Sequence, residues 1–436
     1  MALTVEIEKQ LYDFNEVRDI SSFSNPGFSI AIYKADIEKL WDERISGQIV
    51  DTNGNVQNVS LKIYQWCQYR LLKLQVALSQ YFLNFENHIE MMIACAIAQE
   101  PILFIGPPGV AKTELAISFF GGIGLRRPTA DSKEKQNDSK YFEYLLSPYT
   151  VPEELFGLLD IDKLKDGEVT RINQNMITGK HVRGVFLDEV FNASSNILNT
   201  LLTLINERRY FDKGMFQPAD LKILIGASND TPVGKYGSGQ GFAGKKSAEL
   251  RAFYDRFTIR LYFPTPQELS PTNEALIKDN YKKILEISQE RTMEKLTMER
   301  PQEFRQIACI NDILLLGRLI GHRNMKLPEE IQELALSVIS GLSLKRSVKE
   351  LCTMSPRKAN KVIPMICASS FLIPPENLRT NRNGNFSTEE LIKYVNKDTY
   401  PKVSEKNLTA FYHIWDFEKD RGQLENEVNT LLEQMQ

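Results

Sequence analysis

The stretch that decides the fold is Ile102-Leu103-Phe104-Ile105-Gly106-Pro107-Pro108-Gly109-Val110-Ala111-Lys112-Thr113-Glu114. Four apolar residues, typical of a buried strand, lead into a glycine-containing loop and then into a helix with apolar positions at Leu115, Ala116 and Phe119. In that setting, backbone N–H groups and the positive helix N-terminus surround phosphates. The residues expected to bind a nucleotide are Gly106, Pro107, Pro108, Gly109, Val110, Ala111, Lys112, Thr113 and Glu114.

Within this loop, Lys112 is expected to reach the terminal phosphates and Thr113 to bind Mg²⁺. The usual pattern has glycine before the lysine, whereas Ala111 stands there, so that position should tolerate a Cβ. A purely structural glycine-rich turn is the alternative interpretation of the loop taken alone.

An acidic pair supplies the second half of the predicted site. Val185-Phe186-Leu187 reads as a buried strand that ends in Asp188 and Glu189, and ligands of open parallel sheets bind at this end of the strands. Asp188 would hold Mg²⁺ through water, and Glu189 would act as general base on the attacking water. The alternative is that Asp188 and Glu189 are simply two solvated acids at a strand end. The phosphate-binding loop upstream argues against this alternative.

Three further polar side chains follow along the chain. Asn229 closes the apolar strand Ile223-Leu224-Ile225 and could orient the water, although a strand-end Asn is often a simple turn former. Arg256 precedes the fifth strand, where it could reach a neighbour's phosphates or merely pair with Asp255. Arg357 follows Ser355-Pro356 at a helix start and could carry nucleotide state into domain rotation, or be a solvated helix-start residue.

Short apolar strands alternate with helices from about 84 to 264, which predicts an α/β core with a parallel sheet covered on both faces. Residues 1–83 read as an N-terminal extension, with a hairpin around Asn53-Gly54 and a helix over 61–83. Residues 265–378 read as an all-helical domain, and 379–436 as a segment ending in an amphipathic helix. The five predicted strands are Ile102–Ile105, Phe142–Leu145, Val185–Leu187, Ile223–Ile225 and Thr258–Leu261.

Composition excludes several classes of protein. The 436 residues are 42% hydrophobic and 25% charged, which is ordinary for a globular chain of two or three domains. No apolar run approaches the roughly 18 to 20 residues of a membrane span, and the N-terminus lacks signal-peptide character, so a cytoplasmic location is expected. The five dispersed cysteines suggest buried thiols rather than a zinc site or disulfides, and the net charge of -3 gives no drive toward nucleic acid.

Taken together, these segments resemble the MoxR family of AAA+ ATPases, and most closely its RavA-like branch. The residues that carry the likeness are GPPGVAKTELA (106–116), FEYLLSPYTVPEELFG (142–157), VFLDEVFNASSNILNTLLTLINERRY (185–210), ILIGASND (223–230), LRAFYDRFTIRL (250–261) and SPRKANKVI (355–363). Alanine before the lysine is usual in that family. By this resemblance Lys112 and Thr113 correspond to Walker A, Asp188 and Glu189 to Walker B, Asn229 to sensor 1, Arg256 to the arginine finger and Arg357 to sensor 2.

The resemblance also implies a mode of action. It predicts an ATP-hydrolysing, Mg²⁺-dependent ring, expected to be a hexamer, that acts as a chaperone or remodelling ATPase on a partner protein. The partner would be a protein with a von Willebrand factor A domain encoded nearby. Inserted hairpins are expected over 160–180 and around Lys213-Gly214, both facing a central pore, and whether Arg357 serves its own or a neighbour's nucleotide stays open.

Two other functions are kept as alternatives. The chain could be a nucleic-acid motor or part of a defence system acting on DNA, supported locally only by the lysines at 235, 245 and 246. It could also be a scaffold that ATP assembles and hydrolysis only disassembles, with partner recognition by the first 80 residues and the last helix.

Overall fold

The structure is a computed structural model in which the placed residues are 48–50, 56–128, 139–166, 171–212, 215–229, 250, 252–269, 278, 282, 285, 304, 306–321, 327–344, 355–380, 386, 388–395, 403–414 and 421–433. Its centre is a five-stranded sheet in the spatial order β11-β3-β10-β7-β4. Every neighbouring pair is parallel. The strands are β3 (Ile102–Ile105), β4 (Lys140–Leu145), β7 (Val182–Asp188), β10 (Ile223–Ser228) and β11 (Ile259–Tyr262).

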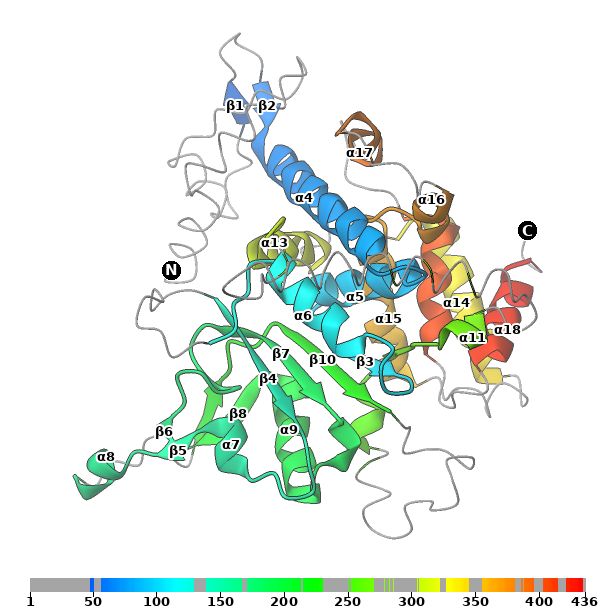
Figure 1. Cartoon of the computed structure of the whole chain (residues 1–436). Helices are drawn as coiled ribbons and strands as arrows, with labels where there is room; N and C mark the ends of the chain where they lie inside the picture. The colour runs from blue at the N-terminus through cyan, green and yellow to red at the C-terminus, as the bar shows by residue number, and fades with distance from the viewer. Residues whose placement is uncertain are drawn as a thin grey trace.

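The five strands predicted from the sequence are therefore confirmed, with β4, β7 and β10 extending beyond the predicted bounds and β11 displaced by one residue toward the C-terminus. All residues of β3 and β10 are buried, which explains their continuous apolar runs. Helix α6 (Lys112–Gly122) follows β3, and helix α9 (Ser195–Glu207) follows β7. The connections β3 to β4 and β7 to β10 run in opposite directions across the sheet. Right-handed crossovers therefore place α6 and α9 on opposite faces, as Figure 1 shows.

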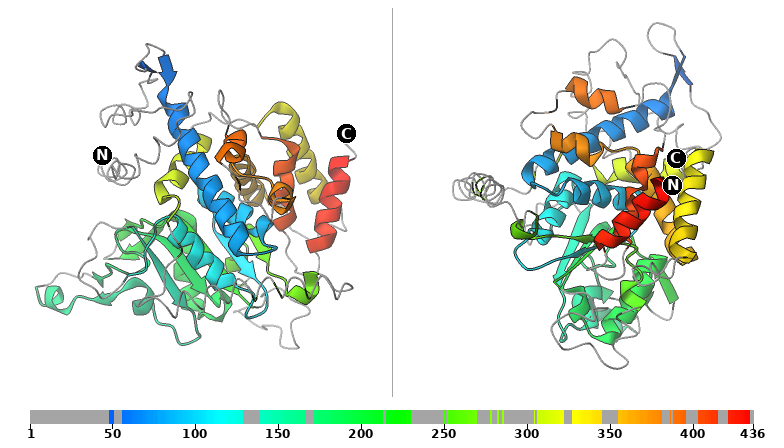
Figure 2. Two further views of the ribbon diagram at one scale, coloured as in Figure 1. Left: turned by 45° about the horizontal axis from the view of Figure 1, so that its top comes forward. Right: turned by 90° about the vertical axis from the view of Figure 1, so that its right-hand side faces the viewer.

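Most of the other described helices gather to one side of the sheet (Figure 2). The helical lid predicted after residue 264 is confirmed: Ile310–Gly321, Glu329–Leu344 and Pro356–Ser369 form helices where the apolar periodicity placed them. Helix α15 packs on α5 and α13 packs on α4. The longer helices are α4 (Val59–Tyr81), α5 (Glu86–Ala98), α13 (Ile310–Gly321), α14 (Glu329–Leu344), α15 (Pro356–Ser369) and α18 (Arg421–Glu433), and the shorter ones include α7 (Pro152–Phe156), α11 (Pro266–Leu269), α16 (Pro375–Thr380), α17 (Thr388–Tyr394) and the 3-10 helix η3 (Glu405–His413).

Helix α4 connects the predicted N-terminal extension to the rest of the chain. Its residues Cys67, Leu71, Leu74 and Leu78 are fully buried and belong to the same apolar cluster as the strands of the sheet. The apolar core is thus continuous across the domain boundary predicted at residue 83. The sequence alone could not show which surface α4 would cover. Ahead of α4, β1 (Gln48–Val50) and β2 (Val56–Asn58) pair antiparallel as predicted, whereas the turn at Asn53-Gly54 lies outside the described residues.

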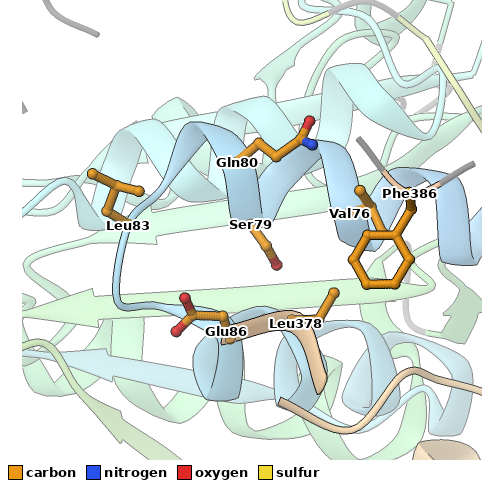
Figure 3. A pocket seen from close by; sticks show the side chains of 7 residues that line it. All are labelled: Val76, Ser79, Gln80, Leu83, Glu86, Leu378 and Phe386. Atoms are coloured by element: carbon orange, nitrogen blue, oxygen red, sulfur yellow. The ribbon is translucent and has the colours of Figure 1, made fainter. Parts of the chain in front are cut away.

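A second apolar cluster lies on the other face of α4. Val76 meets Leu378 and Leu391 there, so the segment after residue 370 is held against α4. Beside it lies a small cavity of about 70 Å³, shown in Figure 3. The cavity is lined by Val76, Ser79, Gln80, Leu83, Glu86, Leu378 and Phe386. Because it is too small for a nucleotide, it is a packing defect between helices.

Two small hairpins project from the sheet. β5 (Leu158–Leu159) pairs with β6 (Arg171–Ile172), with the short helix α8 (Ile161–Lys165) between them, and β8 (Arg209–Asp212) pairs with β9 (Met215–Pro218). These are the positions predicted for the inserted hairpins. Residues 167–170 of the first hairpin and Lys213-Gly214 of the second lie outside the described residues. Exposed apolar side chains are frequent here, including Leu158, Leu159, Ile161, Leu164, Ile172 and Phe216.

Other predictions from composition fit the described residues. Cys67, Cys95, Cys309 and Cys367 are buried free thiols, and Cys352 lies outside the described ranges. Among the placed side chains no cluster of His, Cys, Asp and Glu could hold a metal ion by itself. No helix in the described part of the chain is both long and apolar enough to cross a bilayer.

Glu90 on α5 provides a stability test of the helical packing. Its side chain is buried, and burial, together with the nearby charge of Glu376, raises the pKa of Glu90 to about 8. Between about pH 4.5 and 8 the folded chain therefore holds a proton that the unfolded chain has lost, so this group's contribution to stability is present at low pH and is lost as the pH rises. We expect Glu90→Gln to raise the melting temperature above that of the parent at alkaline pH, with the difference vanishing near pH 4.5.

Thermal unfolding followed by circular dichroism across this pH range checks the prediction. Glu376→Gln is the matched control, because Glu376 is exposed and should produce only a small change in the same direction. A Glu90→Gln difference that is constant with pH would contradict the assignment.

Candidate functional site

The loop between β3 and α6 lies at the carboxyl end of the sheet. Gly106 donates its N–H to the carbonyl of Ser228 at 3.3 Å, and a Cβ at Gly106 would clash with the backbone oxygen of Phe263. Gly109 has a φ of 82°, a conformation that glycine adopts readily. Ala111 also adopts a left-handed φ of 63°, so the position does accept a Cβ, at a cost of about 1 kcal/mol.

Lys112 begins α6 and points back along the loop. Its side chain is only 6% exposed, and Nζ donates to the carbonyls of Gly106 and, at 3.0 Å, Pro107. A third bond from Nζ reaches Oδ1 of Asn229 at 2.8 Å. Burial lowers the pKa of Lys112, while the carboxylates of Asp188 and Glu189 act in the opposite direction. The ammonium is therefore held by neutral oxygens in a position where phosphate oxygens would be stronger acceptors.

The acidic pair lies directly across from the loop. Thr113 donates its hydroxyl to Oδ2 of Asp188 at 3.1 Å, while Oδ1 of Asp188 accepts the backbone N–H of Glu189 at 2.9 Å. Glu189 itself has a left-handed φ of 52°, the kind of backbone strain found at functional sites. Its carboxylate is held from both sides, with Oε1 accepting from Nδ2 of Asn229 and Oε2 from Nδ2 of Asn192 at 3.4 Å.

Asn229 thus connects the two halves of the site. Its amide oxygen accepts from Lys112 and its amide nitrogen donates to Glu189, so both ends of the side chain have defined partners. The structure brings together all the residues predicted at this end of the sheet. Asn192 was not predicted, although its position three residues after Glu189, in a single turn of 3-10 helix, is a signal that could have pointed to it.

The residues present suit a nucleotide triphosphate with Mg²⁺. The hydroxyl of Thr113 and the carboxylate of Asp188 are adjacent oxygen donors, which is the ligand type that Mg²⁺ prefers. The first turn of α6 supplies backbone N–H groups beside them. Lys112 adds a positive charge on the same side of the loop, so charge and donor type both fit phosphate.

Arg256 and Arg357 do not join this group. They line a separate cleft of about 430 Å³, hereafter the arginine cleft, with Gln99, Glu100, Pro101, Ile205, Asn206, Glu207, Arg208 and Lys361. Gln99 to Pro101 directly precede β3, and Arg256 lies three residues before β11, whose Ile259 pairs with Ile102 at the start of β3. The arginine cleft is therefore at the amino edge of the parallel sheet, opposite the carboxyl edge that holds Lys112.

This separation decides what the arginines can contact. Arg357 is exposed in the first turn of α15, where Ser355 caps the helix by accepting the N–H of Lys358 at 3.2 Å. Asp255 lies 3.8 Å from Arg260 rather than pairing with Arg256. The structure thus brings Arg256 and Arg357 to one place, and that place is not beside the phosphate-binding loop of the same chain.

A five-stranded sheet in this order, with a phosphate-binding loop after one strand and an acidic pair after another, defines an AAA+ P-loop ATPase core. Comparison with known proteins agrees: residues 69–270 match the family model described as the MoxR domain in the MoxR-vWA-beta-propeller ternary systems. The ATPase core of this chain belongs to the MoxR family of AAA+ ATPases. The predicted RavA-like branch within that family stays a prediction.

Individual relatives cover the same part of the chain. Two uncharacterized proteins of Methanocaldococcus jannaschii are each 35% identical, one over 194 residues and the other over 192, which is 44% of this chain and 43% of each relative. A structural protein of Acidianus two-tailed virus is 27% identical over 216 residues, 49% of this chain and 29% of that protein. The chain thus matches less than half the length of these relatives.

A solved structure extends the likeness in fold. A candidate ATPase from Cytophaga hutchinsonii superposes with a TM-score of 0.52, covering 85% of this chain and 96% of that one, at 14% sequence identity. At this identity the comparison supports the fold alone, and it includes the helical lid as well as the sheet.

Asn229 offers a direct test of the site geometry. We expect Asn229→Ala to lower the rate of ATP hydrolysis on the order of 10²-fold, because Glu189 loses its closest hydrogen-bond donor, while nucleotide binding by the backbone loop is retained. A coupled-enzyme phosphate assay and titration with a fluorescent ATP analogue measure the two effects. Asn192→Ala is the matched control, since its longer contact with the other oxygen of Glu189 predicts a smaller loss. Equal losses in the two variants would contradict the role of Asn229.

Proposed function

We propose that this chain hydrolyses ATP at a site completed by a second copy of itself, and that it uses this reaction to remodel a partner protein. The observation that carries the proposal is the separation of two sets of residues, Lys112 with Glu189 at the carboxyl edge of the sheet and Arg256 with Arg357 at the amino edge. One copy holds the nucleotide, and the next supplies the arginines.

Each residue of the carboxyl edge has a defined part in the proposed reaction. Lys112 and the loop backbone bind the β- and γ-phosphates, and Thr113 with Asp188 would hold Mg²⁺, which when bound neutralises charge on those phosphates. Glu189 accepts the proton of the attacking water, and Asn229 orients both that water and the carboxylate. The contacts of Asn229 support this assignment, because they fix Glu189 and Lys112 relative to each other.

Arginines from a neighbour would complete the site. Charge builds up on the transferring phosphoryl group, and a guanidinium placed there stabilises it, by a factor of about 10³ to 10⁵ in related enzymes. In this arrangement hydrolysis depends on assembly, which suits a motor that must act only as a ring. We take Arg357 to act in trans together with Arg256, because both line the arginine cleft.

The assembly proposed is a ring, with six copies as the expected number, acting as a chaperone or remodelling ATPase of the RavA-like type in the cytoplasm. The matched family model describes MoxR domains of systems that also contain vWA and beta-propeller components. A protein with a von Willebrand factor A domain is therefore the partner we propose. The hairpins β5–β6 and β8–β9, with their exposed apolar side chains, would face the substrate.

Glu189→Gln tests the reaction and its partner together. The variant keeps the shape of Glu189 and its contact with Asn229 but removes the base, so we expect ATP binding to be retained and turnover to fall at least about 10²-fold. Expressed in the source cells, it should retain a vWA-domain protein only when ATP is present, as read by mass spectrometry of co-purified chains. Turnover like that of the parent would contradict the proposed mechanism.

Arg256→Ala tests completion by a neighbour. For the parent chain, the rate of hydrolysis per copy should rise with protein concentration until assembly is complete, because a lone copy lacks the arginines. We expect Arg256→Ala to reduce the saturated rate by about 10³-fold while a single copy still binds ATP. Arg379→Ala is a control, since this arginine of α16 pairs with Glu86 of α5 and does not line the arginine cleft. A parent rate per copy that is independent of concentration would refute the shared site.

A further inference from the structure

Arg208, which was not singled out from the sequence, occupies the junction where α9 ends. It is the residue after α9 and has a left-handed φ of 53°, with its backbone N–H bound to the carbonyl of Leu204 at 3.1 Å. Its carbonyl accepts the N–H of Ala219 at 2.8 Å, just beyond β9. The backbone of Arg208 is thus fixed on both sides, and the direction of its side chain is set by the fold.

The guanidinium of Arg208 enters the arginine cleft. One nitrogen, Nη2, donates to the carbonyl of Gln99 at 2.6 Å, which anchors the group at the start of β3. The other, Nη1, is shielded from solvent and has no hydrogen-bond partner among the described residues. Burial lowers the pKa of Arg208, with the charge of Glu100 acting in the opposite direction. Arg208 as a whole is half-buried, but a shielded nitrogen with an unused N–H leaves a strong hydrogen bond unmade.

The charges of the arginine cleft point to an anionic ligand. Its two acids already have partners, since Glu100 lies 2.6 Å from Lys361 and Glu207 lies 2.6 Å from Arg209. Among the described residues Arg208, Arg256 and Arg357 form no salt bridge, although Glu100 acts on Arg208 at longer range, so three guanidinium groups surround one cleft. Their planar donors suit phosphate oxygens, which can accept two parallel bonds from one guanidinium.

We propose that Arg208 contacts the phosphates of the nucleotide held by a neighbouring copy, acting beside Arg256 as a further arginine of the shared site. This inference rests on the proposed function, because it takes the neighbour's triphosphate as the anion that enters the arginine cleft. A free phosphate or sulfate ion would have the same chemistry. The two sources differ in one respect: only if the phosphates belong to a neighbour's nucleotide does Arg208 of one copy change the rate of ATP hydrolysis in the adjacent copy.

The position of Arg208 also connects a phosphate bound there to helix α9 and to the β8–β9 hairpin. Helix α9 begins six residues after Glu189 and ends at Arg208, so it spans the molecule from one edge of the sheet to the other. Directly after Arg208 comes β8, the first strand of the β8–β9 hairpin. A phosphate bound by Arg208 would therefore stabilise one particular placement of this hairpin relative to the arginine cleft.

The test mixes variants of the full-length chain. Arg208→Ala keeps its own nucleotide loop but supplies no Arg208, whereas Glu189→Gln cannot hydrolyse ATP but still supplies Arg208. We expect Arg208→Ala alone to lose hydrolysis by about 10-fold or more. An equal mixture with Glu189→Gln should recover activity well above the sum of the two alone, because some Arg208→Ala copies then sit next to an intact Arg208.

Controls separate this role from a structural one. Arg379→Ala changes an arginine outside the arginine cleft, which pairs with Glu86, and should hydrolyse ATP like the parent. Arg208→Lys keeps the positive charge but not the planar guanidinium, and it should hydrolyse ATP at an intermediate rate. If Arg208→Ala unfolds at a lower temperature than the parent, Arg208→Lys takes its place in the mixture. Nucleotide-dependent assembly of each variant is followed by sedimentation velocity.

The outcomes are distinct. Recovery in the mixture supports the inference, whereas loss of activity without recovery would mean that Arg208 serves its own chain or a free anion, and the inference would be overturned. Full activity of Arg208→Ala while Arg256→Ala is inactive would also overturn it, yet would leave the proposed function standing. A parent chain that neither assembles nor hydrolyses ATP would instead refute the proposed function itself.

Discussion

The parallel pairing of β3, β10 and β7 is the constraint on which the rest of the site depends. Because their carboxyl ends meet at one edge, the loop after β3, the acids after β7 and the amide after β10 are brought within hydrogen-bond distance. No residue of the site has to be placed by a flexible segment. Lys112, Asn229 and Glu189 form a continuous chain of polar contacts, so moving β10, which Asn229 directly follows, by a single residue would break both of them.

The same sheet directs a different set of side chains to its other edge. Arg256 reaches it because β11 is parallel to β3, Arg208 because α9 returns antiparallel to the strands, and Arg357 because α15 packs on α5. Three segments that are distant in sequence thus form one cationic cleft. Each arrives there through packing of apolar residues that have no part in the chemistry.

The sequence predicted the sheet well, and with it the grouping of Lys112, Asp188 and Asn229 at its carboxyl edge, for a physical reason. Strands buried on both faces need unbroken apolar runs, and the residues after them, such as Asp188 and Asn229, are then placed by topology alone. It did not predict how α4 packs, because apolar periodicity shows that a helix has a buried face but not which surface covers it. Arg208 was missed for a related reason: at a helix end an arginine usually meets only solvent, and its role depends on Gln99, more than a hundred residues away.

Placing the nucleotide loop and the arginine cleft at opposite edges gives each copy a direction. Two copies related by a two-fold axis contact each other through the same patch, so a loop could meet a cleft there only if both lay on that patch, and their opposite edges preclude this. The proposed shared site would therefore need head-to-tail contacts, which either close by rotation or continue into an open filament. Small changes in the angle between neighbouring copies would then decide between a finite particle and an extended polymer.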